Sequence, residues 1–133
     1  MFKPIFIIYK NVRWQGLCEN PNAITLLEQN LDKIDWYYLS ENPNAIHLLK
    51  QYPNKIKRVA LSSNPNAIEL LENNIDNIAW FMLSTNPNAI HLLEQNLDKI
   101  DWSNLSQNEN AIELLEKNAD KIENCIIFLF MKS

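Results

Sequence analysis

Two histidines are the residues of this chain that could most readily hold a metal ion. His47 and His91 occupy the same position of a repeated sequence and lie two repeats apart. Packed helices lie about 8–10 Å apart, so two repeats would separate the imidazole rings by roughly 16–20 Å. A ligand atom lies about 2 Å from its metal, so one ion cannot be bound by both rings. We therefore interpret both as surface histidines.

No set of nucleophile and base stands out either, because the serines and aspartates recur at fixed positions of the repeat. The single glycine, Gly16, cannot form a glycine-rich phosphate loop. One serine position lies two residues before each repeated Asn-Pro-Asn-Ala-Ile string, and we expect its hydroxyl to bond to the backbone. The members of this position are Ser40, Ser62, Ser84 and Ser106, with Cys18 as their first equivalent. The sequence predicts a protein that is not an enzyme and binds no metal or cofactor.

Two further polar positions repeat. One is a mainly acidic row that could attract a cation or a basic partner, although a solvated helix face is the simpler interpretation. Its members are Glu28, Lys50, Glu72, Glu94 and Glu116. The other is an invariant asparagine, for which we predict a ladder of amide hydrogen bonds between repeats. Its members are Asn22, Asn44, Asn66, Asn88 and Asn110.

These residues are positioned by a repeat of 22 residues without insertions. The string Asn-Pro-Asn-Ala-Ile marks each copy, with glutamate in place of proline in the last. The copies begin at Asn20, Asn42, Asn64, Asn86 and Asn108. A fixed period of this length is typical of stacked-repeat proteins, in which each unit packs only on its neighbours.

The first half of each repeat predicts a short amphipathic helix. Asn20 suits an N-cap, and Pro21 suits the first helical position. Ala23, Ile24, Leu26 and Leu27 fall on one arc at 100° per residue. Asn30 could end the helix in the left-handed conformation, and Leu31 could supply the accompanying apolar contact.

The second half predicts a second helical segment that Asp32 would cap. It would run through Ile34, Trp36 and Leu39 to Ser40 as one element. Its apolar residues fit a 3₁₀ turn better than one α-helical face, and the type of helix is left open.

We therefore predict an all-α, right-handed solenoid of stacked short helix pairs with a 22-residue repeat. Residues 1–16 would form an N-terminal cap and half-repeat, 17–126 five repeats, and 127–133 an apolar C-terminal cap or tail. Five columns should form the core. They are Ala23/45/67/89/111, Ile24/46/68/90/112, Leu26/48/70/92/114, Leu27/49/71/93/115 and Ile34/56/78/100/122.

Composition excludes several functions. A net charge of −4 argues against nucleic acid as a partner. The longest apolar run, Cys125 to Met131, is too short to span a bilayer, so no membrane partner is expected. Cys18 and Cys125 lie almost five repeats apart, too far for a disulfide, which favours a reducing compartment.

The repeat resembles a known sequence. Residues 83–102 read Leu-Ser-x-Asn-Pro-Asn-Ala-Ile-x-Leu-Leu-Glu-x-Asn-x-Asp-Lys-Ile-Asp-Trp, which resembles a short repeat of many proteins of large amoeba-infecting DNA viruses of the mimivirus kind. The resemblance implies a viral protein in the host cytoplasm, leaves packaging in the virion open, and implies no catalytic chemistry. The chain departs from this repeat pattern at three places: Arg58 replaces Trp, Glu109 replaces Pro, and Tyr52-Pro53-Asn54 replaces Asn-Leu-Asp. The architecture is similar to leucine-rich-repeat variants and HEAT-like solenoids.

Function is expected to reside in the columns that vary. A partner-binding face is predicted at Tyr37, Tyr38, Arg58, Phe81 and Met82, because aromatic residues, Met and Arg are enriched in interface cores. The adjacent tryptophan row could be an interaction surface or part of the packing between repeats, and we favour packing. Its members are Trp14, Trp36, Trp80 and Trp102. We thus predict a non-enzymatic scaffold for a host or viral protein. The alternative is a structural protein that forms homo-oligomers through the apolar tail, at Ile126, Phe128 and Phe130.

Overall fold

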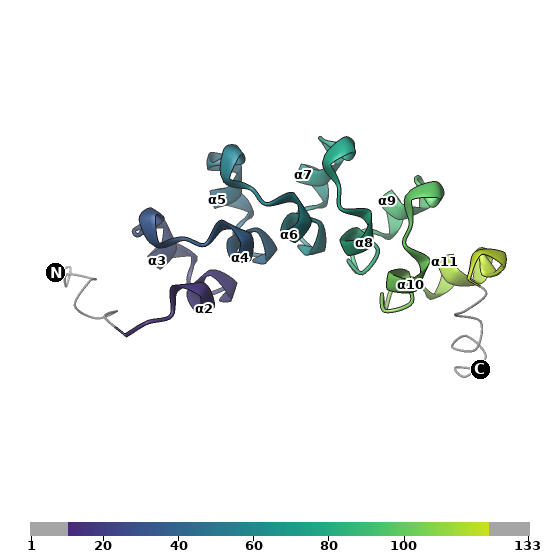
Figure 1. Cartoon of the computed structure of the whole chain (residues 1–133), viewed down its shortest axis with the longest axis horizontal. Coiled ribbons are helices and arrows are strands. Elements are labelled where there is room, and N and C mark those ends of the chain that lie inside the picture. The colour runs from purple at the N-terminus through teal and green to yellow at the C-terminus, as the bar shows by residue number, and fades with distance from the viewer. Residues whose placement is uncertain (1–10, 123–133) are drawn as a thin grey trace.

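The computed structural model describes residues 11–122, which form an all-α stack of short repeats (Figure 1). A described repeat consists of an α-helix, a 3₁₀ turn and a second α-helix, the fifth being described only through its 3₁₀ turn, and residues 11–122 contain no strand. The predicted all-α repeat fold is therefore confirmed. Its right-handed sense and the division of the chain at residues 16 and 126 stay predictions.

The first helix of each repeat, helix A, is α3 (Ile24–Glu28), α5 (Ile46–Gln51), α7 (Ile68–Glu72), α9 (Ile90–Glu94) or α11 (Ile112–Lys117). The 3₁₀ turns are η1 (Leu31–Lys33), η2 (Pro53–Lys55), η3 (Ile75–Asn77), η4 (Leu97–Lys99) and η5 (Ala119–Lys121). The second helix, helix B, is α4 (Trp36–Glu41), α6 (Arg58–Ser63), α8 (Trp80–Leu83) or α10 (Trp102–Leu105), preceded by α2 (Trp14–Glu19) in the same position.

Helix A begins later than its sequence predicts. The N–H of Ala23 donates to the oxygen of Asn20 at 3.1 Å, and the N–H of Asn22 donates to Asn20 Oδ1 at 2.9 Å. These bonds form an Asx turn with Pro21 inside it, and the N-cap of α3 is Ala23. The predicted N-cap at Asn20 is wrong, because its side chain closes the turn instead of capping the helix.

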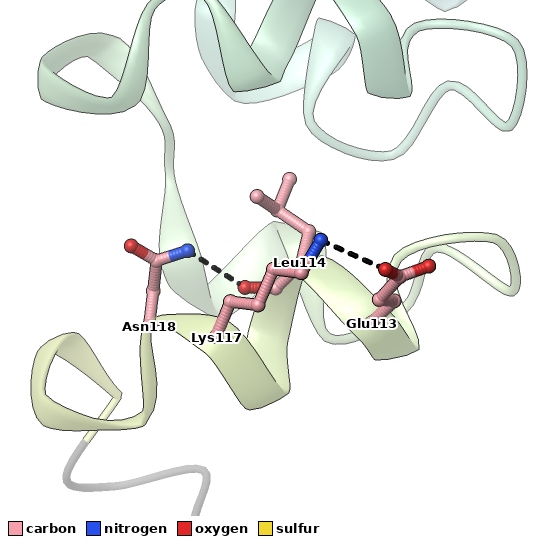
Figure 2. A network of polar contacts seen from close by, with 4 residues as sticks. All are labelled: Glu113, Leu114, Lys117 and Asn118. Atoms are coloured by element: carbon pink, nitrogen blue, oxygen red, sulfur yellow. Dashed lines mark hydrogen bonds and ion pairs between the residues drawn. The ribbon is translucent and has the colours of Figure 1, made fainter.

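An asparagine ends helix A through a side-chain hydrogen bond, not through the left-handed backbone conformation that was predicted. Asn30 has a φ of −139°, and no residue in the described range 11–122 has a positive φ. Its Nδ2 donates to the oxygen of Leu26 at 2.9 Å, so the side chain pairs a carbonyl that the helix end leaves free. Figure 2 shows Asn118 making the same bond to Leu114. The left-handed ending predicted at Asn30 is wrong, and Leu31 is exposed.

The second half of the repeat is two elements, not one. Ile34 and Asp35 are extended, with ψ of 126° and 106°, and separate η1 from α4. Asp35 rather than Asp32 caps α4, accepting from the N–H of Tyr37 at 3.0 Å. The break lets both Ile34 and Leu39 reach the core, which one short helix could not do. Helix B is α-helical, and the 3₁₀ geometry is confined to the preceding turn.

The core follows three of the five predicted columns closely. The alanine column and the Leu27 column are buried in every repeat, and the Ile34 column is buried except at Ile56. The column headed by Leu26 is buried in some repeats and half-buried in others. The column headed by Ile24 is half-buried throughout, which corrects the prediction, because this residue begins the helix at the edge of the core.

The stack bends into a shallow arch (Figure 1). Helices B line its inner side and the 3₁₀ turns its outer side. Helix α4 packs against α6, and α6 against α8. Equivalent residues of successive helices B therefore form continuous rows along the inner side.

Candidate functional site

From Asn42 onward, the first asparagine of each repeated string ties its unit to the preceding one. Asn42 Nδ2 donates to the oxygen of Cys18 at 2.8 Å and to that of Asn20 at 3.0 Å. The same pair of bonds is made by Asn64, Asn86 and Asn108. These amides are buried, so they fix the spacing and register of the repeats. This role was not predicted from the sequence, because a helix cap was a sufficient explanation for the asparagine.

The third residue of the string forms a second ladder. Asn44 Nδ2 donates to the oxygen of Pro21 at 2.9 Å. The equivalent bonds join Asn66 to Pro43, Asn88 to Pro65 and Asn110 to Pro87. The predicted amide ladder between repeats is confirmed.

The serine position provides a third ladder. Ser40 Oγ donates to the oxygen of Trp36 at 2.6 Å and accepts from the N–H of Lys57, in the next repeat, at 3.0 Å. Cys18 Sγ accepts from the N–H of Asp35 at 3.4 Å in the same way. Burial raises the pKa of the Cys18 thiol above its usual range. The expectation that these serines bond to the backbone is confirmed, so the serine position and the two asparagine positions all join neighbouring repeats.

The residues of possible catalytic or metal chemistry are spread over the surface. His47 Nε2 lies 3.1 Å from Gln51 Nε2, and His91 Nε2 lies 3.2 Å from Gln95 Nε2. All four residues are exposed. In the part of the chain that the structure describes, no three His, Cys, Asp or Glu residues are grouped so that they could hold a metal ion. The mainly acidic row of helices A is exposed throughout, and Lys50 Nζ pairs with Glu69 at 3.7 Å.

The tryptophan row packs against the core. Trp36, Trp80 and Trp102 are half-buried on it. A residue from the following turn covers each ring. Lys99 Nζ lies 5.2 Å from the centroid of Trp80, Lys121 Nζ lies 5.9 Å from that of Trp102, and the ring of Tyr52 lies 5.5 Å from that of Trp36. We interpret this row as structural.

An apolar row is exposed at the second residue of three neighbouring helices B. Tyr37 on α4 is 40% exposed, Val59 on α6 is 41% exposed and Phe81 on α8 is 47% exposed. The same row is polar at both ends, where Gln15 on α2 and Ser103 on α10 are also exposed. The apolar surface is therefore confined to the central helices and has a polar boundary along the row.

Some of the predicted partner-binding residues lie in this exposed row, and the others are half-buried beside it. Tyr37 and Phe81 belong to it. Tyr38 and Met82, which we expected at the surface, are half-buried one residue further along, and the Tyr38 ring meets that of Tyr37 edge-on at 5.6 Å. Arg58 is half-buried at the start of α6. The tail residues Ile126, Phe128 and Phe130 lie outside the described residues.

Val59 is the exposed residue that the predicted site omitted. It occupies the same repeat position as Tyr37 and Phe81, but the predicted site was chosen for aromatic residues, methionine and arginine. The start of α6 at Arg58 settles its direction, since it places Val59 beside Tyr37 and Phe81. We call Tyr37, Tyr38, Val59, Phe81 and Met82 the B-face patch.

The fold and the ladders together define an all-α repeat solenoid with an exposed apolar patch on its helices B. Comparison of the chain with protein-family models, curated proteins and solved structures finds no match. Across residues 11–122 no helix is long and apolar enough to cross a bilayer.

Proposed function

We propose that this chain is a non-enzymatic scaffold that binds another protein through the B-face patch. The observation that carries the proposal is the row of Tyr37, Val59 and Phe81, which is exposed on three adjacent helices and bounded by polar residues. Protein interfaces commonly combine an apolar, aromatic centre with a polar rim. Tyrosine is also enriched among the residues that dominate binding energy.

The ladders support this function because they hold the patch in place before binding. Asn64 and Asn86 join the repeats that carry α4, α6 and α8, and their amides are buried. A surface already in its bound arrangement loses little conformational entropy on association, which favours affinity. Repeat proteins use such extended, inward-facing surfaces for recognition.

The resemblance of the repeat to giant-virus proteins supports the setting that we propose. The partner would be a host or viral protein, met in the host cytoplasm or in the virion. The acidic balance of the chain, at −4, supports a protein rather than a nucleic acid as that partner.

The test is affinity capture from host-cell lysate with the Val59→Ser/Phe81→Ser double variant beside the wild type. Serine is the natural residue of this row at Ser103, so the fold accommodates it. The matched control is Ile75→Ser, which removes an apolar side chain that is 38% exposed on the outer side of the arch.

We expect a partner that both the wild type and the control capture and that the patch variant loses, with equal melting temperatures for all three. Equal capture by the patch variant would overturn the proposal. Recovery of the chain alone would favour the alternative of self-assembly through the tail.

A further inference from the structure

The segment that leads into α6 departs in charge from its equivalents. Residues 32–36 and 98–102 both read Asp-Lys-Ile-Asp-Trp, whereas residues 54–58 read Asn-Lys-Ile-Lys-Arg. Two carboxylates and one lysine are thus replaced by three cations, so the formal charge of the segment changes from −1 to +3. This cationic segment stands in a chain whose net charge is −4.

The three cations are unpaired in the described part of the chain. Lys55 and Lys57 are exposed and Arg58 is half-buried. The ion pairs of residues 11–122 are Lys50 with Glu69 and Lys117 with Glu113, and neither involves this segment. No side chain of the segment is hydrogen-bonded within the same range. Three neighbouring cations repel one another, and within residues 11–122 no ion pair or side-chain hydrogen bond offsets that repulsion.

The cations lie next to the centre of the B-face patch. Lys57 is the N-cap of α6, and Arg58 and Val59 are its first two residues. Helices α4 and α8 pack on either side of α6 and carry Tyr37 and Phe81. A partner seated on the apolar row therefore passes beside the start of α6.

We propose that the B-face patch binds an apolar protein segment that carries a carboxylate, which pairs with Lys57 and Arg58. The inference rests on the proposed function and specifies the partner's chemistry. The apolar side chains of the segment contact Tyr37, Val59 and Phe81. The acidic group fixes its register, because unlike charges across an interface select position and partner.

The charges of neighbouring repeats favour a discrete carboxylate over a polyanion. Asp35 and Asp101 cap α4 and α10 in the row where α6 has Lys57. The turns before and after the cationic segment carry Asp32 and Asp76. A nucleic-acid strand or an anionic membrane would extend across these carboxylates and be repelled, whereas one acidic side chain meets only the central repeat.

The decisive variant restores the sequence that the chain already uses elsewhere. Asn54→Asp, Lys57→Asp and Arg58→Trp together turn residues 54–58 into Asp-Lys-Ile-Asp-Trp, which folds at residues 32–36 and 98–102. Lys57→Ala is a milder second variant, because Ala79 occupies the equivalent position. The probe is a displayed library of random short peptides, selected separately on the wild type, on the restored variant and on the Val59→Ser/Phe81→Ser variant.

We expect the wild type to select peptides that combine apolar residues with Asp or Glu. The restored variant loses both ion pairs with the peptide's carboxylate and should therefore bind the selected peptides about tenfold more weakly. Lys57→Ala should fall between the two. Added NaCl should weaken binding to the wild type more than to the restored variant, because salt screens exposed charges.

The outcomes separate the two proposals. Apolar peptides without acidic enrichment, or equal binding by the restored variant, would overturn this inference but leave the proposed function intact. Peptides that bind the Val59→Ser/Phe81→Ser variant as well as the wild type would overturn both, as would the absence of any enriched peptide. Single-stranded RNA and phosphatidylserine vesicles are the comparison probes, and charge-dependent binding to either would replace the acidic peptide as the ligand.

Discussion

Replacing Asn64 by alanine tests whether the buried asparagine ladder holds the repeats together. Asn64 Nδ2 donates to the oxygens of Ser40 and Asn42 at 2.9 and 2.8 Å, and Asn64 is 0% exposed. Alanine would leave two buried carbonyls without these donors. The oxygen of Asn42 keeps its bond from the N–H of Ala45, so of the two only the oxygen of Ser40 is left without a donor within residues 11–122. An unsatisfied buried polar group costs about 1–3 kcal/mol and the second lost bond about 1 kcal/mol, so we expect Asn64→Ala to lower the free energy of unfolding by about 2–4 kcal/mol.

The chain provides a matched control in Asn20. Asn20 begins the first copy of the same string and accepts from the N–H of Asn22 at 2.9 Å, as Asn64 does from Asn66 at 3.0 Å. It is exposed, and its Nδ2 has no acceptor within residues 11–122. Asn20→Ala should therefore cost about 1 kcal/mol or less, the contribution of one exposed local hydrogen bond.

The measurement is urea denaturation followed by circular dichroism for the wild type and both variants. The difference between the two variants isolates the bonds between repeats, because the local turn is lost in both. If Asn64→Ala and Asn20→Ala destabilise the protein equally, the ladder does not stabilise the stack and the reasoning fails.

Two further predictions concern the ends of the first helices B. Burial, reinforced by the nearby charge of Glu19, raises the pKa of Glu41 above its usual range, so the folded state holds this proton more tightly than the unfolded state. Glu41→Gln should therefore raise the free energy of unfolding at neutral pH. This gain should disappear as the pH falls from the raised pKa of Glu41 in the folded state to its lower pKa in the unfolded state. A gain that persists unchanged in acid would contradict this prediction. Cys18→Ser should change the free energy of unfolding by less than about 1 kcal/mol, since serine fills the same ladder position in later repeats and can accept from Asp35. A loss above about 2 kcal/mol in urea denaturation would show that the thiol has a packing role that a hydroxyl cannot fill.

The architecture could be predicted because each repeat must fit a neighbour of the same shape. That requirement keeps Ala67 and Leu71 identical to their equivalents, and it predicts buried columns without knowledge of the helix ends. Asn66 could also be predicted as a contact between repeats, because capping a single helix would not require asparagine at both positions of the Asn-Pro-Asn string. Both columns are buried in every repeat and Asn66 forms its bond.

The helix boundaries could not be predicted, because local hydrogen bonds compete with helix capping. In Asn20-Pro21-Asn22 the first side chain can cap a helix or close an Asx turn, and composition does not separate the two. Asp32 was the predicted cap of the second segment, but Asp35 has the same capping side chain and is the residue that caps α4. The extended pair Ile34 and Asp35 decides between them, and it arises from packing rather than from local propensity.

The later start of helix B also explains why the exposed residues of the candidate site were predicted only in part. A helix that begins at Asp32 gives no clear direction for residue 37 or 38. Once α4 is known to begin at Trp36, Tyr37 faces solvent and Tyr38 supports it. The exposed row and the inclusion of Val59 follow from the start of helix B, which the sequence left ambiguous.

The departures of the α6 repeat are better explained by binding than by loss of regularity. Arg58 replaces the tryptophan of its row, and Asn77 replaces the lysine that covers this ring at Trp80 and Trp102. Both members of the tryptophan–lysine contact are thus replaced in this repeat. The replacement of the lysine by Asn77 avoids placing a second cation beside the guanidinium of Arg58. The hydrogen-bonded ladders stay intact in the same repeat, because Ser62 and Asn64 make all their ladder bonds. Helix α6 also keeps the six-residue length of α4. Changes confined to the surface beside the patch, with the framework preserved, are what selection for a partner at this one repeat would leave.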